Sequence, residues 1–319
     1  MPSKAAQSDV ATTRVEPTSR SFIISEHLLP APKAAPGLHL VATPIGNLGD
    51  ITLRALQTLA GVDVIACEDT RVTRRLTERY GITATLKPYH EHNASAARPK
   101  ILQMLAAGAS IALVSDAGTP LISDPGFKLV REVCAAGYSV IALPGASSVL
   151  TALALAALPT DRFFFEGFLP SKQGARRHRI DELARIPATL VMFESGNRVQ
   201  DTLADLAAAM DGRDAAICRE LTKLHEEILR GPVAALAQSA ATLETRGEFV
   251  LVVGPPPAQA QIMAADQLDD VLRAALKRGS VKDAVANAVE VSGRPRREVY
   301  ARALELAGEH RGDDGDAAV

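Results

Sequence analysis

Two acidic side chains stand in a loop of glycine, proline and hydroxyl residues at positions 115–126. The carboxylates of Asp116 and Asp124 can accept hydrogen bonds from ligand hydroxyls or face a cation. Glycines let the backbone approach a ligand closely, and prolines leave little loop entropy for binding to remove. Asp124 as the cap of a following helix, with Pro125 in its first turn, would explain only the end of the loop. We therefore predict a binding loop.

A second group of polar residues offers side chains for proton transfer and phosphate binding. Glu68 and Asp69 stand beside Arg71, and His90 is followed by Glu91. A carboxylate or the histidine could serve as a general base, and Arg71 could hold a phosphate. The alternatives are a helix start that favours acidic residues and, for the histidine segment, a solvated loop. The H-E-H spacing does not put two histidines on one helical face, so we predict no metal site.

The segments that precede these loops have the pattern of buried parallel strands. Short apolar runs at 38–42, 62–67, 110–114 and 138–143 alternate with helical patterns, which predicts a parallel α/β domain. Ligands bind such sheets at the carboxyl ends of the strands, so we expect the loops to line one cleft. Neither a G-x-G-x-x-G nor a Walker pattern occurs, so these nucleotide-binding fingerprints are absent.

A second α/β unit is expected after a hinge at 159–161. Its first strand, 163–170, contains four of the eight phenylalanines, which form a core or wall a pocket for a flat ring. Further strands are expected at 189–195, 215–223 and 248–254. A basic run after the first strand is interpreted either as a solvated helix face or as a contact for nucleic-acid phosphates. It comprises Lys172, Arg176, Arg177, His178 and Arg179.

Residues 266–311 have the pattern of a small helical unit. Three apolar-periodic segments are expected to be helices: 268–276, 281–289 and 297–306. Ser280 is expected to cap the middle helix. Between positions 273 and 302 the chain has eight Lys and Arg residues against three Asp and Glu. Short helices joined by a basic turn are typical of a helix-turn-helix that contacts nucleic acid, with a dimer or capping module as the alternative.

The composition excludes several classes of protein. A chain of 319 residues with 47% hydrophobic residues can bury a core and has room for two or more domains. Its net charge of −2 provides no global attraction to nucleic acid or membranes, and its apolar runs are too short to span a membrane. Cys67, Cys134 and Cys218 lie far apart without metal or disulfide spacing, which indicates a reducing cytoplasm. Residues 1–36 have no signal-peptide core and are expected to be a flexible tail.

Seven motifs occur in order along the chain. They are V-A-T-P-I-G-N-L-G-D (41–50), C-E-D-T-R (67–71), Y-H-E-H-N (89–93), S-D-A-G-T-P-L-I-S-D-P-G (115–126), P-G-A-S-S (144–148), F-E-G-F-L-P (165–170) and R-E-L-T-K-L-H-E-E (219–227). With these motifs the chain resembles the ribosomal RNA small subunit methyltransferase I family, ribose 2′-O-methyltransferases of the tetrapyrrole-methylase fold. Each motif is weak alone, and their common order makes the signal strong. The resemblance covers about residues 38–254 and continues into the helical tail.

The resemblance implies an α/β fold: two α/β/α domains with a cofactor cleft between them, plus a small C-terminal helical unit of helix-turn-helix type. The units expected are a disordered tail (1–36), an N-terminal α/β domain (37–158), a second α/β domain (159–256) and a helical unit (262–311). S-adenosylmethionine is the implied cofactor, and a cytoplasmic homodimer is the implied form. The implied substrate is a cytidine in the decoding region of 16S rRNA, within the assembled or nearly assembled small ribosomal subunit.

The expected site residues fall into two groups. Those expected to bind the cofactor are Pro44, Gly46, Asp116, Ala117, Gly118, Pro120, Ser123, Asp124, Ser147, Ser148 and Phe168. Those expected at the catalytic side are Glu68, Asp69, Arg71, His90 and Glu91. Methyl transfer from a sulfonium to a hydroxyl needs alignment above all and requires no metal. Either one of the acidic residues or the histidine of the second group acts as the general base, or the enzyme positions the two reactants without a base.

Two other functions fit the same fold. Methylases of tetrapyrrole carbons and of the diphthamide precursor share it, so a corrin or porphyrin C-methylase is the alternative enzyme. Those relatives have a G-G-D-P-like loop where this chain has S-D-A-G-T-P, and a small substrate requires no basic helical tail. The second of these functions is that of a non-catalytic ribosome-binding factor that uses the fold as a platform.

Overall fold

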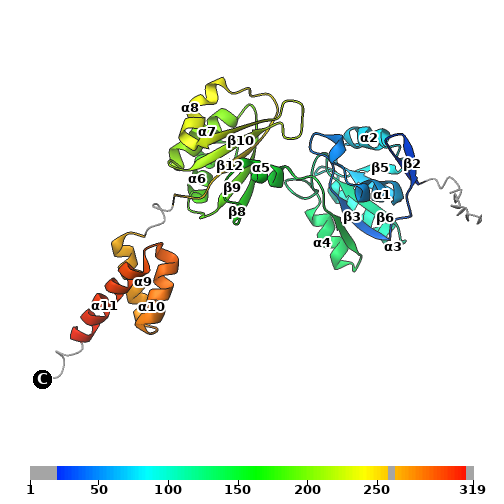
Figure 1. Ribbon diagram of the computed structural model, residues 1–319. Helices are drawn as coiled ribbons and strands as arrows, with labels where there is room; N and C mark the ends of the chain where they lie inside the picture. The colour runs from blue at the N-terminus through cyan, green and yellow to red at the C-terminus, as the bar shows by residue number, and fades with distance from the viewer. Residues whose placement is uncertain (1–19, 258–262, 314–319) are drawn as a thin grey trace, which may run out of the picture.

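The computed structural model describes residues 20–257 and 263–313. Figure 1 shows three units in chain order: an N-terminal α/β domain, a second α/β domain and a helical unit near the C-terminal end. The two α/β domains each contain a five-stranded sheet. Among the described residues, no helix combines the length and the apolar character that a membrane span requires.

A parallel sheet with the strand order β5-β4-β6-β3-β7 organises the N-terminal domain. Its strands are β3 (Gly37–Val41), β4 (Val64–Cys67), β5 (Thr85–Pro88), β6 (Ser110–Val114) and β7 (Val140–Leu143). β4 and β6 are buried at every position, which explains their continuous apolar sequences. β5 is a mostly exposed edge strand without such a run, and the sequence did not predict it. Because the strands are parallel, the loops after them meet at one edge of the sheet, as predicted.

Four helices cover the two faces of this sheet. They are α1 (Leu53–Gly61), α2 (Thr70–Arg79), α3 (Ala94–Ala106) and α4 (Phe127–Ala135). Leu56 of α1 and Leu76 of α2 belong to the core on one face, and Ile101 of α3 and Leu129 of α4 belong to the core on the other. The N-terminal domain therefore has the three-layer α/β/α arrangement that the resemblance implied.

The expectation of a flexible tail through residue 36 is wrong for residues 20–36. Strands β1 (Ser21–Ile24) and β2 (His27–Pro30) form an antiparallel hairpin. The side chain of Phe22 is 2% exposed and packs in the core beside α1, and Arg20 pairs with Asp63 at 2.7 Å. The Ser-, Thr- and Ala-rich composition behind the expectation is concentrated in residues 1–19, which lie outside the described residues.

The second domain contains a mixed sheet with the strand order β11-β10-β12-β9-β8. Its strands are β8 (Phe163–Phe168), β9 (Thr189–Ser195), β10 (Asp214–Arg219), β11 (Glu227–Pro232) and β12 (Glu248–Val253). Only β8 and β9 pair in parallel; β12, β10 and β11 add antiparallel neighbours. The ends of β9 and β10 and the start of β12 therefore meet at one edge of the sheet. β10 ends at Arg219, earlier than the predicted residue 223, and β11 was not predicted.

Helices pack on both faces of the second sheet. One face is covered by α6 (Gln173–Leu183), α7 (Val199–Ala209) and α8 (Val233–Ser239), followed by the 3-10 turn η2 (Ala240–Thr242), and the other by α5 (Ser148–Ala156). We expected α5 to belong to the N-terminal domain, which was drawn to residue 158. That boundary is wrong, because Ala152 and Leu153 of α5 share a core with Val191 and Val252 of the second sheet.

Three helices form the C-terminal unit. They are α9 (Ala265–Leu276), α10 (Val281–Ser292) and α11 (Arg296–Asp313). Leu272, Val285 and Val299 join them in one small core. The Ser280 hydroxyl accepts a hydrogen bond from the Asp283 backbone N–H, so the predicted cap of the middle helix is confirmed. Arg296 and Arg297 of the predicted basic turn form the start of α11 and are exposed.

Candidate functional site

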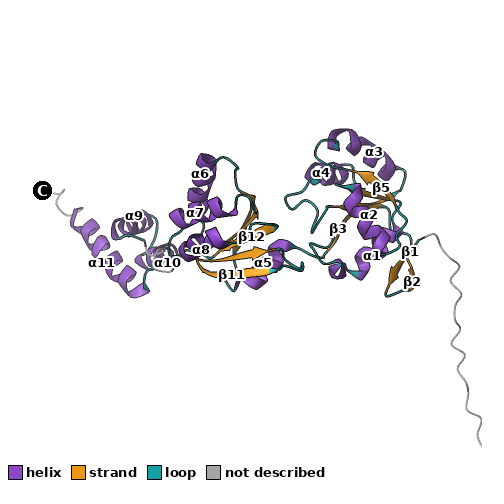
Figure 2. Cartoon of the chain, turned by 90° about the horizontal axis from the view of Figure 1, so that it is seen from above, coloured by secondary structure: helices purple, strands orange, loops and turns teal. Residues whose placement is uncertain are grey.

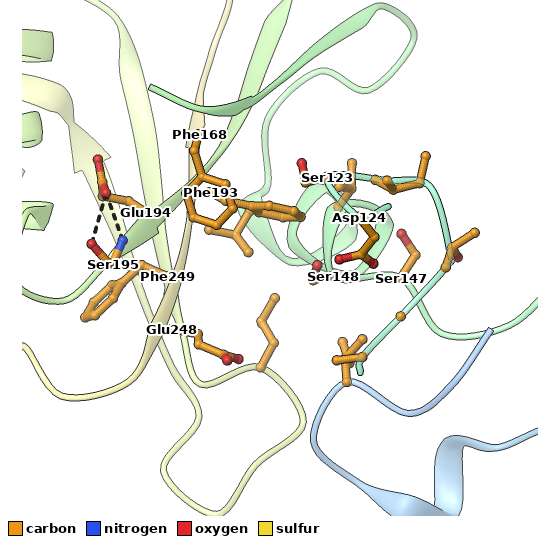
Figure 3. Close-up of a pocket in the computed structure, with 18 of the residues that line it drawn as sticks. Ser123, Asp124, Ser147, Ser148, Phe168, Phe193, Glu194, Ser195, Glu248 and Phe249 are labelled. Atoms are coloured by element: carbon orange, nitrogen blue, oxygen red, sulfur yellow. Dashed lines mark hydrogen bonds between the residues drawn. The ribbon is translucent and has the colours of Figure 1, made fainter. Parts of the chain in front are cut away.

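A cavity of about 330 Å³ lies between the two α/β domains. Figure 3 shows its polar wall of hydroxyls and a carboxylate facing an aromatic wall. The N-terminal side and the start of α5 contribute Ile45, Ala117, Gly118, Thr119, Ile122, Ser123, Asp124, Ser147, Ser148 and Val149. The second domain contributes Phe168, Phe193, Glu194, Ser195, Leu221, Gly247, Glu248, Phe249 and Val250. This size and this mixture of apolar and polar lining are typical of small-molecule sites.

Backbone hydrogen bonds fix the loops of the polar wall to one another. Thr43 and Gly118 exchange N–H···O bonds of 2.9 and 3.0 Å, which joins the loop after β3 to the loop after β6. The Thr119 hydroxyl donates to the Ala146 carbonyl at 3.3 Å and adds the loop after β7. Gly118 has φ +79°, a conformation that favours glycine. This explains why the sequence motif has a glycine at the residue that bonds to Thr43. The polar wall is therefore pre-formed.

Strained backbone occurs on both sides of the cavity. Leu121 and Ser123 on the N-terminal side have φ of 77° and 63°. Glu220 and Thr222, in the loop after β10, have φ of 50° and 65°. Non-glycine residues rarely adopt positive φ, least of all the β-branched threonine, and such strain concentrates at ligand sites. The positive φ of Glu220 takes the chain out of the extended conformation, so β10 ends at Arg219.

The aromatic wall is built by strand ends of the second domain. The Phe193 ring makes edge contacts with Phe165 at 5.0 Å and with Phe168 at 5.5 Å between ring centroids. Phe168 is 56% exposed, although it is a large apolar side chain at the cavity. Exposed aromatic surface beside a cavity is a favourable contact for a flat, apolar ring. The structure thus favours the pocket-wall interpretation for this phenylalanine over the core interpretation.

A buried carboxylate holds the end of β9 in place. Glu194 accepts hydrogen bonds from the Ser195 backbone N–H at 2.8 Å and from the Thr202 hydroxyl at 2.7 Å. Arg198 lies 3.5 Å from the same carboxylate and donates to the Leu169 carbonyl at 2.9 Å. Glu194 is therefore occupied by partners within the protein. It ties the Phe193 end of β9 to the segment that follows Phe168.

Four carboxylates gather at the strand ends of the N-terminal domain, and we call them the acidic cluster: Glu68, Asp69, Asp116 and Asp124. Burial raises the pKa of Glu68, and the charges of its three neighbours raise it further. Burial also raises the pKa values of Asp116 and Asp124. Hydrogen bonds from Arg71 hold the pKa of Asp69 at about 2. Within the cluster, Asp69 is therefore ionised at neutral pH, and the other three carboxylates hold protons more readily than it does.

The cavity contains seven of the eleven expected cofactor residues: Ala117, Gly118, Ser123, Asp124, Ser147, Ser148 and Phe168. The other four lie beside it. Asp116 accepts a hydrogen bond from the Asp69 N–H at 3.0 Å, Gly46 packs against Thr222 and Lys223, and Pro44 and Pro120 are buried.

The expected catalytic residues lie outside the cavity lining, at two neighbouring strand ends. Glu68 and Asp69 belong to the acidic cluster, which reaches the cavity through Asp124. His90 and Glu91 follow β5, whose neighbouring Tyr89 donates its N–H to the Cys67 carbonyl of β4 at 2.7 Å. The buried His90 Nδ1 atom has no hydrogen-bond partner in the described part of the chain. The roles of these residues stay predictions.

The basic run at the start of α6 is largely neutralised within the protein. Arg176 is 3% exposed and, with Arg177, binds the Asp205 carboxylate at 2.7 Å. Arg179 binds Glu166 at 2.7 Å and Glu182 at 2.6 Å. Its arginines are thus engaged by structural ion pairs, which disfavours the phosphate interpretation of this run.

Sequence reasoning missed most of the second-domain wall. Phe193, Glu194, Leu221 and Phe249 stand within or next to apolar strand sequences, where a buried side chain and a cavity-lining side chain have the same pattern. Their position at strand ends was the available signal. Among the residues that the structure describes, no group of three or more His, Cys, Asp and Glu side chains is arranged to hold a metal ion.

Comparison with known proteins identifies the family. Residues 37–237 match the family model of the tetrapyrrole (corrin/porphyrin) methylases, and residues 263–307 match that of the RsmI C-terminal HTH domain. A ribosomal RNA small subunit methyltransferase I of Mesorhizobium japonicum is 47% identical over 286 residues, which cover 89% of this chain and 97% of that protein. One from Escherichia coli O157:H7 is 45% identical over 276 residues, with coverages of 85% and 96%.

Solved structures show the same fold at low sequence identity. A diphthine synthase superposes with a TM-score of 0.55 at 14% identity and covers 71% of this chain and 91% of its own. The cobalt precorrin-4 methyltransferase CbiF superposes with a TM-score of 0.53 at 17% identity, with coverages of 68% and 94%. With its two family matches and its extended identity to named relatives, the chain belongs to the ribosomal RNA small subunit methyltransferase I family, and it is a methyltransferase with a tetrapyrrole-methylase fold.

Proposed function

We propose that this chain transfers the methyl group of S-adenosylmethionine to the ribose 2′-hydroxyl of a cytidine in the decoding region of 16S rRNA. The observation that carries the proposal is the cavity between the domains, where an exposed phenylalanine faces hydroxyls and a carboxylate. The cavity belongs to a chain of the rRNA small subunit methyltransferase family.

The cavity residues fit the chemical parts of this cofactor. The ring of Phe168 offers a flat apolar surface for an adenine, and Ser147 and Ser148 offer hydroxyls for polar groups. The carboxylate of Asp124, which lines the cavity, provides negative charge near a cation. The cofactor would supply a methyl group on a positively charged sulfur, and in an in-line displacement the sulfur would depart as a neutral thioether while the ribose oxygen takes the methyl group.

The protein contributes alignment and a proton acceptor. The pre-formed loops hold reacting groups in place, and such positioning supplies roughly 7–11 kcal/mol in favourable cases. Of the two predicted bases in the acidic cluster, Asp69 is the weaker, since its pKa is about 2. Glu68 has a raised pKa and is half-buried, so its carboxylate accepts the proton of the ribose hydroxyl more readily. We assign the role of general base to Glu68.

The experiment that tests the proposal compares substrates. Purified protein is incubated with methyl-labelled S-adenosylmethionine and either small ribosomal subunits or uroporphyrinogen. We expect label in the small-subunit rRNA and none in the tetrapyrrole. Label in the tetrapyrrole would replace the proposal with a C-methylase, and label in neither would favour a non-catalytic binding factor.

The chain is further proposed to act in the cytoplasm as a homodimer. The cysteines support a reducing compartment, because Cys67 and Cys218 are buried free thiols and Cys134 is exposed without a partner thiol. Light scattering at micromolar protein tests the oligomeric state, and a monomer mass would contradict the homodimer.

A further inference from the structure

Helix α2 presents arginines to solvent along one side. Arg71, Arg74, Arg75 and Arg79 are all exposed, while the opposite side packs on the N-terminal core through Leu76. Positions three and four apart lie on the same face of a helix, so these side chains form one continuous row. We call it the α2 arginine face.

Three of these arginines have no carboxylate partner. In the described part of the chain, no carboxylate oxygen lies within 4.0 Å of Arg74, Arg75 or Arg79, and the one acidic residue of the helix, Glu78, forms no ion pair either. Arg71 pairs with Asp69 at 2.6 Å. The face therefore differs from the basic run of α6, whose arginines are bound to carboxylates of their own domain. The charges of Arg74, Arg75 and Arg79 are therefore available to an external anion.

The position of α2 connects this charge to the candidate site. The helix begins directly after Asp69, whose backbone N–H donates to Asp116 of the acidic cluster at 3.0 Å. At the other end, Arg79 lines an open groove of about 870 Å³ together with Asn47 of the same domain and Lys223 of the second domain. The α2 arginine face thus extends from the acidic cluster to the groove between the domains.

We propose that the α2 arginine face binds rRNA phosphates that flank the target nucleotide. The inference rests on the proposed function, since it requires an RNA substrate. An RNA strand that places one ribose beside Glu68 lies next to the start of α2, because Glu68 directly precedes Asp69, the cap of that helix. Guanidinium groups bind phosphate oxygens through two parallel hydrogen bonds, and binding releases the counterions of the RNA.

A charge-matched pair of variants tests this surface. Arg74→Gln/Arg75→Gln removes two charges from the α2 arginine face with a residue that favours helices. Lys100→Gln/Arg185→Gln removes two charges from exposed positions on α3 and after α6. Figure 1 shows α2 at the top of the N-terminal domain, α3 on the lower side of that domain and α6 in the second domain, so both control positions belong to elements away from α2. Both proteins are full-length chains with S-adenosylmethionine present.

The measurement is the affinity for small ribosomal subunits as a function of salt, from about 0.05 to 0.3 M. Each contact to a single-stranded phosphate contributes about 0.7 to the slope of log affinity against log salt, which corresponds to about 5-fold in affinity near 0.1 M. We expect the Arg74→Gln/Arg75→Gln protein to bind about 25-fold more weakly near 0.1 M, with a slope smaller by about 1.4. The control pair should change neither quantity, and cofactor affinity by calorimetry should be equal in all proteins.

A third variant extends the test, and the methylation assay separates the docking inference from the function on which it rests. Arg79→Gln, at the groove end of the helix, should lose about 5-fold in subunit affinity near 0.1 M salt. If the unaltered protein methylates small subunits but Arg74→Gln/Arg75→Gln matches the control in affinity and slope, the docking inference is overturned and the proposed function stands. If the unaltered protein methylates no small subunits, the proposed function fails and the docking inference falls with it.

Discussion

Replacement of Glu68 by glutamine should remove the proton acceptor and leave the cofactor cavity intact. Glu68 lies in the acidic cluster and outside the cavity lining, and glutamine keeps its size and its hydrogen-bonding oxygen. A positioned general base contributes about 10²–10⁴-fold to a rate. We therefore expect turnover on small subunits to fall by about two to four orders of magnitude, with cofactor affinity nearly unchanged.

The pH dependence provides the sharper test. A base acts in its deprotonated form, so the rate falls as acid protonates it. Burial and the charges of Asp116, Asp124 and Asp69 raise the pKa of Glu68 above its ordinary value of 4.5, so the acid limb of the rate should lie at higher pH than for an exposed glutamate. Single-turnover methyl transfer measured as a function of pH should show this limb in the unaltered protein and lose it in Glu68→Gln.

Asp69→Asn is the matched control. The pKa of Asp69 is about 2, so this carboxylate is ionised throughout the accessible pH range and cannot produce the limb. The Asp69→Asn protein should therefore keep an acid limb, moved toward lower pH because the charge of Asp69 no longer raises the pKa of Glu68, and its loss of the Arg71 contact lowers the rate. An unchanged rate and limb in Glu68→Gln, or a limb that disappears only in Asp69→Asn, would refute the assignment of the base.

Three other predictions concern the cavity, the core and the tail. Asp124→Ala should weaken cofactor binding by about 1–3 kcal/mol in calorimetry, because the carboxylate lines the cavity; equal affinity in a folded variant would contradict its role. Asp205→Ala leaves Arg176 buried without its partner and should lower the free energy of unfolding by about 3–5 kcal/mol in urea titration, and a loss below 1 kcal/mol would show that the pair contributes little. Deletion of residues 262–319 should flatten the salt dependence of subunit binding and leave cofactor affinity unchanged. Monomers with an unaltered slope would instead make the helical tail a dimer contact.

The elements that sequence predicted well are those with one dominant physical requirement. Strands β4 and β6 are buried on both faces, so every residue is constrained to be small or apolar and the run is visible. Strands β5 and β11 lie at sheet edges with partly exposed residues, so no such constraint marks them. The hairpin at residues 21–30 was missed because a single side chain, Phe22, anchors it in a core whose other residues lie mostly further along the sequence.

The candidate site divides in the same way. The polar wall was predicted because Ser123 and Asp124 belong to loops whose composition is unusual for a simple turn. The aromatic wall was largely missed, because Phe193 and Phe249 are indistinguishable from core residues until the strand order places them at the cavity. The ion pairs of α6 were missed for a related reason. Its partner Asp205 stands on α7 and is brought to it only by helix packing.

The most direct test of the account is the chemical identity of the methylated nucleoside. Small-subunit rRNA labelled by this protein is digested to nucleosides and analysed by mass spectrometry, and the position of the label is checked by alkaline hydrolysis. A 2′-O-methyl group blocks attack of the ribose hydroxyl on the adjacent phosphate, so the methylated linkage should resist alkali. We predict a single ribose-methylated cytidine and an alkali-resistant dinucleotide. A methyl group on a base, or label confined to an alkali-sensitive nucleotide, would contradict the proposed reaction.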